Sequence, residues 1–240
     1  MIKFENVDVY GFEASIRGMR SPMNSWEKSD SGWVSPRASN LLPTIYVVGS
    51  KDLDLMTRLR NAGTDHRKFM RMITVYVDIT APLYWWSEYD TYKVGTVANS
   101  CSKMHTLHKK EFTLDDFSHE HLGDDWNDRK NLVDYNDEYF NTPLDVMRWI
   151  IEALNNYRDL YLETKDKKYW YEMIQLLPSS YNQRRTVMLN YEVLANIYKS
   201  RKGHRLDEWK TMLDWIETLP YSELITGESK DKNETEGEED

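Results

Sequence analysis

The side chains best suited to binding chemistry gather in two stretches of this sequence. The first stretch offers a histidine, a carboxylate, an amide, hydroxyls and lysines, and its candidates are His66, Glu88, Lys93, Thr96, Asn99, Ser102 and Lys103. The second offers cations, and its candidates are Arg184, Arg201 and Lys210. Guanidinium and ammonium groups bind phosphate, and neighbouring hydroxyls and amides fix the orientation of the bound group. Two interpretations of these cations stay open at this point: a pocket for a phosphate-bearing ligand, or a solvent-exposed helix face, where most Lys and Arg side chains lie.

Other constellations of reactive side chains carry less weight. His119-Glu120-His121 and the pair His105 and His108 have metal-ligating side chains, but neither group brings a third ligand at a fixed spacing. Solvent-facing histidines explain both groups better, so no metal is predicted. Cys101 is the only cysteine, and a lone cysteine without a base is more often a small packing residue than a nucleophile.

The order and spacing of the first stretch match a known pattern. It runs from Gly63-Thr-Asp-His66 through alternating residues to Ala81-Pro82, and then through a polar segment to Lys103. This resembles the flavin-dependent thymidylate synthases, which show a Gly-His, an alternating strand, Ala-Pro, and then Gln-Trp-x-Arg-His-Arg-x-x-Ser-x-Asn-Glu-x-Ser-x-Arg-Tyr. The second stretch resembles the C-terminal half of the same family, through Leu177-Pro178, Arg184, Asn190, Leu194, Arg201 and Glu208-Trp209-Lys210. Together the two stretches cover about half of the chain.

An ungapped alignment from Ala81-Pro82 places the family's nucleotide-contacting Gln on Glu88. The Arg-His-Arg of the family then falls on Thr91, Tyr92 and Lys93, so this part of the signature is broken. Thr91 and Tyr92 cannot replace an Arg-His pair electrostatically, and Lys93 keeps the charge of an arginine without its bidentate fork.

Two registers remain open for the rest of the motif. The ungapped register places Thr96 at the first Ser of the family, Asn99 at the Glu and Lys103 at the last Arg. A shift of one residue instead matches Asn99 to the Asn and Ser102 to the second Ser. His66 falls on the family's flavin-contacting histidine in the ungapped register, and the alternative is a surface histidine.

The resemblance implies an enzyme that holds FAD between the subunits of a homotetramer, accepts hydride from NADPH and uses methylenetetrahydrofolate to convert dUMP to dTMP. It implies flavin contacts for His66, Lys93, Thr96, Asn99 and Arg201, and nucleotide contacts for Glu88, Ser102, Lys103 and Arg184. Lys210 would act as the catalytic cation beside the uracil carbonyl. Two alternatives remain. One is a non-catalytic homologue that binds a nucleotide or a protein partner, and the other is a flavoenzyme acting on a different nucleotide, which Glu88 would permit because a carboxylate cannot donate as an amide does.

The elements that would position these residues indicate an α+β fold, which the resemblance specifies as a central antiparallel sheet with packed helices. Residues 73–79 alternate apolar and polar side chains and predict the clearest strand, and a weaker strand is expected around Val7 and Val9. Helical spacing predicts helices over 52–61, 142–154, 166–177, 184–201 and 206–219. Thr80 is expected to cap a further helix over 83–86 that an early proline opens.

Composition sets the remaining expectations. Residues 17–40 predict loop with a helical turn, and residues 114–141 predict a polar surface insertion anchored by Trp126 and Tyr139. Residues 227–240 predict a disordered acidic tail after a single domain over 1–226. The 31 basic and 40 acidic residues give a net charge of −9, which disfavours non-specific binding to nucleic acid or to an anionic membrane. One cysteine and the absence of an apolar run long enough to cross a membrane or act as a signal peptide predict a cytoplasmic protein.

Overall fold

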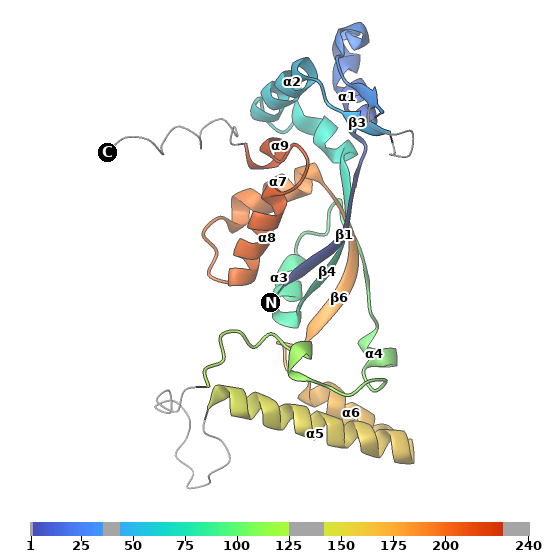
Figure 1. Ribbon diagram of the computed structural model, residues 1–240, viewed down its shortest axis with the longest axis vertical. Coiled ribbons are helices and arrows are strands. Elements are labelled where there is room, and N and C mark those ends of the chain that lie inside the picture. The colour runs from blue at the N-terminus through green and yellow to red at the C-terminus, as the bar shows by residue number, and fades with distance from the viewer. Residues whose placement is uncertain (1, 36–43, 125–141, 228–240) are drawn as a thin grey trace, which may run out of the picture. The chain divides into compact units, whose positions relative to one another are not determined.

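The computed structural model describes residues 2–35, 44–124 and 142–227 (Figure 1). This part of the chain forms two compact units. Of the described residues, the first unit contains 2–3, 79–91, 99–124 and 142–185. The second contains 4–35, 44–78, 92–98 and 186–227. The organisation as a single domain over 1–226 therefore stays a prediction.

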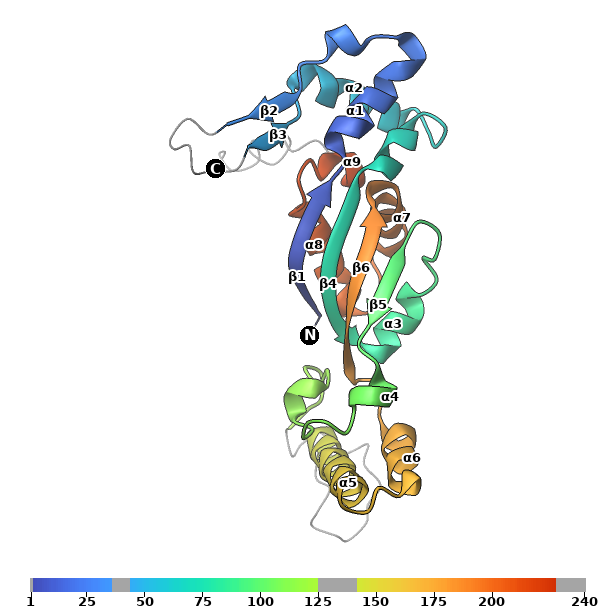
Figure 2. The ribbon, with the colours of Figure 1, turned by 90° about the vertical axis from the view of Figure 1, so that its right-hand side faces the viewer.

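A four-stranded antiparallel sheet has the strand order β1-β4-β6-β5 (Figure 2). Its strands are β1 (Lys3–Tyr10), β4 (Thr74–Pro82), β5 (Val97–Ser100) and β6 (Asn182–Asn190). Val75, Val77 and Ile79 of β4 are buried while Tyr76 is exposed, because successive side chains of a strand point to opposite faces. The alternation over 73–79 thus correctly predicts a strand, and the sheet with its helices confirms the α+β class. A separate antiparallel pair joins β2 (Gly32–Val34) to β3 (Ile45–Val47).

The second unit contains most of the short helices. These are α1 (Phe12–Arg20), α2 (Ser50–Asn61), α7 (Tyr191–Arg201), α8 (Asp207–Glu217) and α9 (Glu223–Thr226), with 3-10 helices η1 (Ser21–Met23), η2 (Trp26–Lys28) and η3 (Arg67–Met72). Helix α7 packs against α8, α9 and η3. The side chain of Asn190 caps α7 by accepting a hydrogen bond of 3.1 Å from the Val193 N–H. Gly11 is the N-cap residue of α1 at φ +100°, where a Cβ would lie 2.0 Å from the Met72 carbonyl oxygen, so no larger residue fits.

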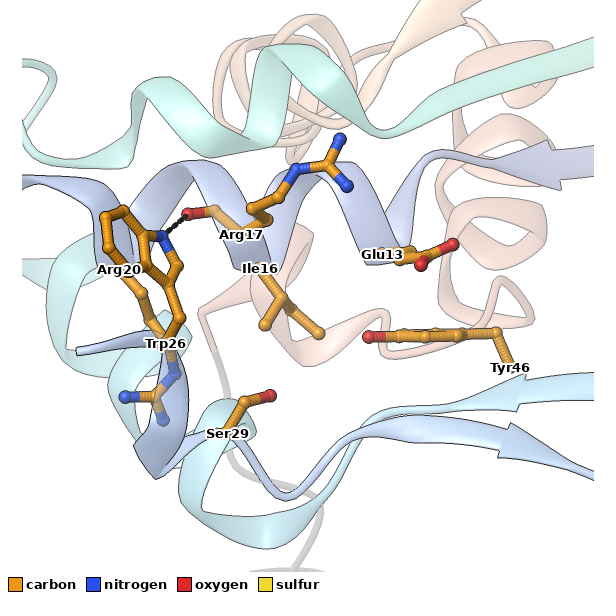
Figure 3. A pocket seen from close by; sticks show the side chains of 7 residues that line it. All are labelled: Glu13, Ile16, Arg17, Arg20, Trp26, Ser29 and Tyr46. Atoms are coloured by element: carbon orange, nitrogen blue, oxygen red, sulfur yellow. Dashed lines mark hydrogen bonds between the residues drawn. The ribbon is translucent and has the colours of Figure 1, made fainter. Parts of the chain in front are cut away.

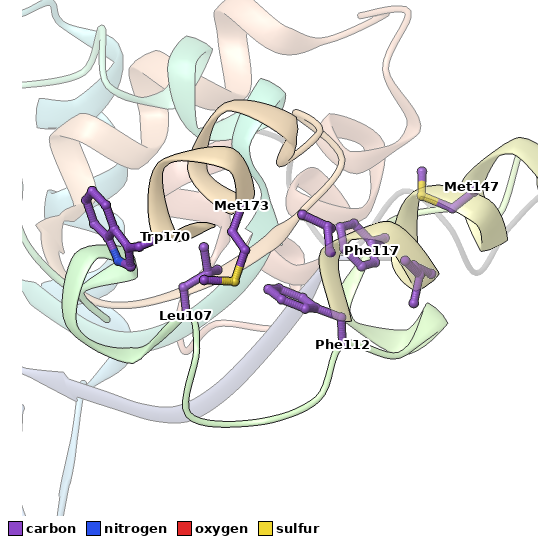
Figure 4. Packing of buried hydrophobic residues seen from close by; sticks show 8 residues of the cluster. Leu107, Phe112, Phe117, Met147, Trp170 and Met173 are labelled. Atoms are coloured by element: carbon purple, nitrogen blue, oxygen red, sulfur yellow. The ribbon is translucent and has the colours of Figure 1, made fainter. Parts of the chain in front are cut away.

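The first unit has its own apolar core. Its helices are α3 (Leu83–Tyr89), α4 (Lys103–Thr106), η4 (Leu114–Asp116), α5 (Pro143–Thr164) and α6 (Lys167–Leu176). The Thr142 side chain caps α5 by accepting from the Asp145 N–H at 3.2 Å, as a threonine before a proline predicts. Figure 4 shows the buried cluster between α5, α6 and the residues on either side of η4. It consists of Leu107, Phe112, Phe117, Met147, Ile151, Leu154, Trp170 and Met173.

The helix predicted over 184–201 is wrong in its first part. Residues 184–190 belong to β6, in which Val187 and Leu189 are buried while Arg184 and Thr186 are exposed. This alternation has a period of two, and the helix begins only after the Asn190 cap. The helices predicted over 52–61, 166–177 and 206–219 are confirmed as α2, α6 and α8.

Three further expectations need correction. In the segment predicted to be loop with a helical turn, η1 and η2 agree with that turn, but residues 17–20 continue α1 and residues 32–34 form β2. Thr80 does not cap α3, because β4 continues to Pro82, and Pro82 itself is the cap without a side-chain hydrogen bond. In the predicted surface insertion, Phe117 is buried in the core of the first unit. The two expected anchors, Trp126 and Tyr139, lie outside the described residues, as does the tail from 228.

Candidate functional site

Five of the predicted site residues lie in the second unit. His66 is exposed at the start of η3, and Lys93 is exposed in the segment before β5. Thr96 is half-buried, and its hydroxyl donates a hydrogen bond of 2.6 Å to the Tyr92 carbonyl oxygen. Arg201 ends α7, and Lys210 is exposed on α8.

The structure holds Arg201 in one orientation between two aromatic rings. Its guanidinium carbon lies 4.2 Å from the centre of the Trp209 ring and 5.5 Å from that of Tyr92. Its Nε donates a hydrogen bond of 2.9 Å to the Tyr92 hydroxyl, which lies 2.7 Å from the Ser200 hydroxyl. Trp209 has 0% of its surface exposed, so the guanidinium of Arg201 packs against an indole ring that the core holds in place. Lys210 directly follows Trp209 in α8, but Lys210 is exposed whereas Trp209 is buried, so the two side chains lie on different sides of the helix.

The other predicted residues lie in the first unit, around β5 and β6. The Cys101 N–H donates to the Arg184 carbonyl oxygen at 3.1 Å, and the Gln183 side chain donates to the Cys101 carbonyl oxygen at 2.9 Å. These bonds bring Asn99 and Ser102, on either side of Cys101, next to Arg184. Asn99 and Arg184 are exposed and Ser102 is half-buried.

Helix α3 carries Glu88, which is half-buried, and is tied to the same strand. The Trp86 indole N–H donates to the Gln183 carbonyl oxygen at 2.9 Å. Lys103 begins α4, but its side chain lies outside the described part of the structure. In this unit, therefore, Glu88, Asn99, Ser102 and Arg184 come from elements that contact one another.

Sequence reasoning missed Arg185, the neighbour of Arg184. Its guanidinium carbon lies 4.1 Å from the centre of the Trp86 ring, and its Nη1 lies 2.8 Å from a carboxylate oxygen of Asp90. Because side chains alternate along β6, Arg184 and Arg185 point to opposite faces of the sheet. The helix prediction over this segment concealed that alternation.

Sequence reasoning also missed a basic cavity of about 390 Å³ in the second unit. It is lined by Arg60, Arg67, Ala195, Asn196, Tyr198, Lys199, Lys202, Ile225 and Thr226. These residues come from α2, η3, α7, α9 and the residues adjoining them, so no local pattern could have assembled them. Lys199 and Lys202 have the three-residue spacing that puts side chains on one face of a helix, but α7 ends at Arg201 and Lys202 is its C-cap residue.

A second cavity of about 240 Å³ lies beside α1 and the β2–β3 pair (Figure 3). Its lining includes Ile16, Tyr46 and Arg20. The pKa of the Tyr46 hydroxyl is raised, first by burial and then by the negative charges of Glu13 and Asp52. Arg20 is itself committed to the structure, because its Nε lies 2.6 Å from the Asp52 carboxylate.

Asp52 has 0% of its surface exposed, and its carboxylate lies at the centre of a buried polar cluster. It accepts hydrogen bonds from the hydroxyls of Ser29 at 2.6 Å and Ser31 at 2.7 Å as well as from Arg20. Burial raises the pKa of Asp52, but these hydrogen bonds and the positive charge of Arg20 outweigh it and hold the pKa below its usual value. The cluster therefore fixes the segment between α1 and β2 to α2.

A third cavity, of about 260 Å³, is lined in part by His119 and His121 of the first unit. The described residues contain no group of three or more His, Cys, Asp or Glu side chains that could hold a metal ion. Cys101 is exposed. Within the same part of the chain, no helix has the length and apolar character needed to cross a membrane.

The arrangement of this antiparallel sheet and its helices is the fold of the flavin-dependent thymidylate synthases. A structure of thymidylate synthase X from Helicobacter pylori with FAD and dUMP has 18% sequence identity, covers 94% of this chain and 97% of its own, and gives a TM-score of 0.63. A second complex of the same enzyme with FAD and dUMP has 19% sequence identity, covers 92% of this chain and 97% of its own, and gives a TM-score of 0.61. The UMP/dUMP methylase PolB from Streptomyces cacaoi, bound to 5-Br dUMP, has 14% identity over 95% of each chain and a TM-score of 0.53. The sequence matches no protein-family model and no curated protein at a significant level.

Proposed function

We propose that this protein is an FAD-dependent enzyme that methylates dUMP to dTMP, with methylenetetrahydrofolate as the one-carbon donor and NADPH as the reductant. The observation that carries the proposal is the similarity in fold, over 94% of the chain, to an enzyme crystallised with FAD and dUMP. The proposal includes a homotetramer, because the resembling family builds its sites between subunits. It also includes a cytoplasmic location, which a single cysteine favours.

In this proposal the protein binds and orients, and bound FAD supplies the hydride chemistry. His66, Lys93, Thr96, Asn99 and Arg201 contact the flavin cofactor. The donor set fits such a group, because Arg201 presents a fixed guanidinium whose plane is set by Tyr92 and Trp209. A fixed cation loses little conformational entropy when an anion binds to it.

The proposed nucleotide contacts are Glu88, Ser102, Lys103 and Arg184. Arg184 is exposed on β6 beside the Cys101 backbone, a position open to a phosphate group. Lys210 on α8 is proposed to stabilise negative charge that develops on the uracil ring during methyl transfer.

A second candidate function is a non-catalytic homologue that binds a nucleotide. One observation favours it: the residues at the family's Arg-His positions are engaged in internal contacts. The Thr91 hydroxyl donates to the Glu88 carbonyl oxygen at 2.8 Å, and the Tyr92 hydroxyl accepts from Arg201 at 2.9 Å. Neither side chain can supply the positive charge that an Arg-His pair would supply.

Flavin content and turnover separate the two functions. The full chain is purified, its absorbance between 350 and 500 nm is recorded for the flavin bands, and its unfolding temperature is measured with FAD and with dUMP. Bound flavin, stabilisation by both ligands and release of tritium from dUMP labelled at C5 are the expected results. Stabilisation by dUMP with neither flavin nor tritium release would favour the non-catalytic homologue. Colourless protein that neither ligand stabilises would overturn both functions.

A further inference from the structure

Strand β6 carries two polar side chains on the face of the sheet that it otherwise fills with apolar ones. Gln183 and Arg185 share this face with Val187 and Leu189, because every second side chain of a strand points the same way. Gln183 is 7% exposed, and the Arg185 side chain is 15% exposed. Burying an amide and a guanidinium costs free energy that apolar side chains at these positions would not cost, so the contacts of this pair call for an explanation.

Three groups hold the Arg185 guanidinium. Its central carbon lies 4.1 Å from the centre of the Trp86 ring, and its Nη1 lies 2.8 Å from Asp90 Oδ1. Its Nε donates to Gln183 Oε1 at 3.2 Å. Trp86 belongs to α3 and Asp90 is the C-cap residue of that helix. Arg185 is therefore held against α3 in an orientation that directs its Nε to the Gln183 side chain.

The hydrogen bond from Arg185 fixes the orientation of the Gln183 amide. A guanidinium can only donate hydrogen bonds, so the amide oxygen must face Arg185 and the amide nitrogen must face the other way. That nitrogen donates to the Cys101 carbonyl oxygen at 2.9 Å. A reversed amide would bring two acceptors together at Cys101 and two donors together at Arg185. Arg185 therefore acts on Cys101 through Gln183.

Cys101 directly follows β5, which lies beside β6 at the edge of the sheet (Figure 2). The Cys101 N–H donates to the Arg184 carbonyl oxygen at 3.1 Å, so β6 binds both the N–H and the carbonyl group of this residue. All residues of β5 are exposed, so side-chain packing contributes little to the position of this segment. Hydrogen bonds to β6 set that position instead, and the Gln183 amide supplies one of them.

We propose that Arg185 is a positioning residue for the nucleotide, which fixes the Gln183 amide and thereby keeps Ser102, the neighbour of Cys101, in place beside Arg184. This inference rests on the proposed function, which supplies Ser102 and Arg184 as nucleotide contacts. Two donors bind one phosphate well only when their relative position is fixed, because a misaligned hydrogen bond is weak. Arg185 points to the opposite face of the sheet from Arg184, so it acts without touching the ligand.

The first test is calorimetric titration of the full chain with dUMP and with FAD. Arg185→Met removes the donors and keeps a side chain of similar length, and it should weaken dUMP about tenfold, because hydrogen bonds to a charged ligand lose their alignment. Gln183→Glu keeps an acceptor for Arg185 but cannot donate to Cys101, so it should weaken dUMP as much. The affinity for FAD should change less, because most of the proposed flavin contacts lie in the second unit.

Arg158→Met is the matched control. Arg158 is an arginine of the same unit with an 18% exposed side chain, and its Nη1 lies 2.7 Å from a carboxylate oxygen of Asp159, the next residue of α5. Its replacement removes a similarly buried and similarly paired guanidinium, and should leave the affinity for dUMP unchanged. Urea unfolding of each variant verifies that it folds.

A second measurement does not depend on the nucleotide. Cys101 is the only cysteine of the chain and is exposed, so a nitroxide attached to its Sγ reports the motion of the segment that carries Ser102. Electron paramagnetic resonance should show faster motion of this label in Arg185→Met and in Gln183→Glu than in the wild type. The label should move no faster in Arg158→Met.

The two measurements separate this inference from the proposed function. Weaker binding of dUMP together with a more mobile label supports the positioning role of Arg185. An unchanged label in Arg185→Met and Gln183→Glu overturns that role, as does wild-type affinity for dUMP in both variants or an equal loss of affinity in Arg158→Met. Wild-type protein that binds no dUMP, with a label that still becomes mobile in the two variants, would defeat the proposed methylation and leave the action of Arg185 on Cys101 standing.

Discussion

Replacing Tyr92 with phenylalanine tests whether this residue positions Arg201. The change removes only the hydroxyl that accepts from the Arg201 Nε at 2.9 Å and lies 2.7 Å from the Ser200 hydroxyl. The stacking of Arg201 on Trp209, with 4.2 Å between guanidinium carbon and ring centre, remains. The guanidinium should therefore keep its location and lose the bond that sets its rotation.

The expected effect of Tyr92→Phe depends on how far solvent reaches the hydrogen bond between Tyr92 and Arg201. A buried hydrogen bond to a charged group contributes about 1.5–3 kcal/mol. Tyr92 and Arg201 are half-buried, so solvent reduces this contribution to roughly 1 kcal/mol, which corresponds to about fivefold in affinity for the ligand that Arg201 is proposed to hold. Tyr92→Ala also removes the ring, whose interaction with a cation contributes about 0.5–2 kcal/mol, and should cost tens of fold.

The assay is calorimetric titration of FAD and dUMP into wild type, Tyr92→Phe and Tyr92→Ala, with urea unfolding to separate binding from stability. Tyr171→Phe is the control, because Tyr171 is an exposed tyrosine of α6. A graded loss for one ligand, with little change for the other, would identify the ligand that Arg201 contacts. Wild-type affinity of Tyr92→Ala for both ligands would refute the reasoning.

Three other changes have defined outcomes. Asp52→Asn leaves the buried Arg20 without its counter-charge, and should cost about 3–5 kcal/mol of unfolding free energy in urea and roughly 10 °C in Tm. Because folding lowers the pKa of Asp52, the ionised carboxylate stabilises the folded protein above about pH 4, and this stabilisation is lost as the pH falls through the folded-state pKa. The Asp52→Asn variant has no such carboxylate, so its unfolding free energy should fall less than that of the wild type over this pH range. Met173→Ala, in the core between α5 and α6, should cost about 2–5 kcal/mol, again measured in urea. Glu88→Gln restores an amide that both donates and accepts, and should raise the affinity for dUMP relative to dCMP in competition binding; an unchanged ratio would remove Glu88 from the nucleotide site.

Local patterns predicted the elements whose burial is regular. Residues 73–79 and helix α8 each present one apolar face, so period and length were sufficient. Strand β5 has every residue exposed, so no apolar alternation marks it, and it was missed. In β6, the alternation over 184–190 runs directly into the apolar positions of α7, so helical spacing fitted over 184–201 merges a strand with the helix that follows it.

The candidate site likewise contains residues that a local pattern predicts and contacts that depend on tertiary packing. The motif pointed to Arg201, but its contact with Tyr92 joins residues 109 positions apart in the chain and has no local signal. The basic cavity is harder to predict from the sequence, because its cations come from separate elements that are brought together only by the packing of α2, η3, α7 and α9. Propensity and periodicity place such elements along the chain but do not place them against one another.

Two groups of residues bear on how this chain could hold an anionic ligand: the residues at the motif and the cations of the cavity. In the ungapped alignment from Ala81-Pro82, Thr91 and Tyr92 fall where the resembling family has an Arg-His pair, and neither side chain carries a positive charge. Arg60 and Lys199 supply charge elsewhere, at positions the motif does not include. If both sets act on one ligand, Tyr92→Phe and Lys199→Gln should weaken FAD by amounts whose free energies add, since they share no contact. If each variant instead weakens a different ligand, the chain has two anion sites, and the motif alone would have predicted only one.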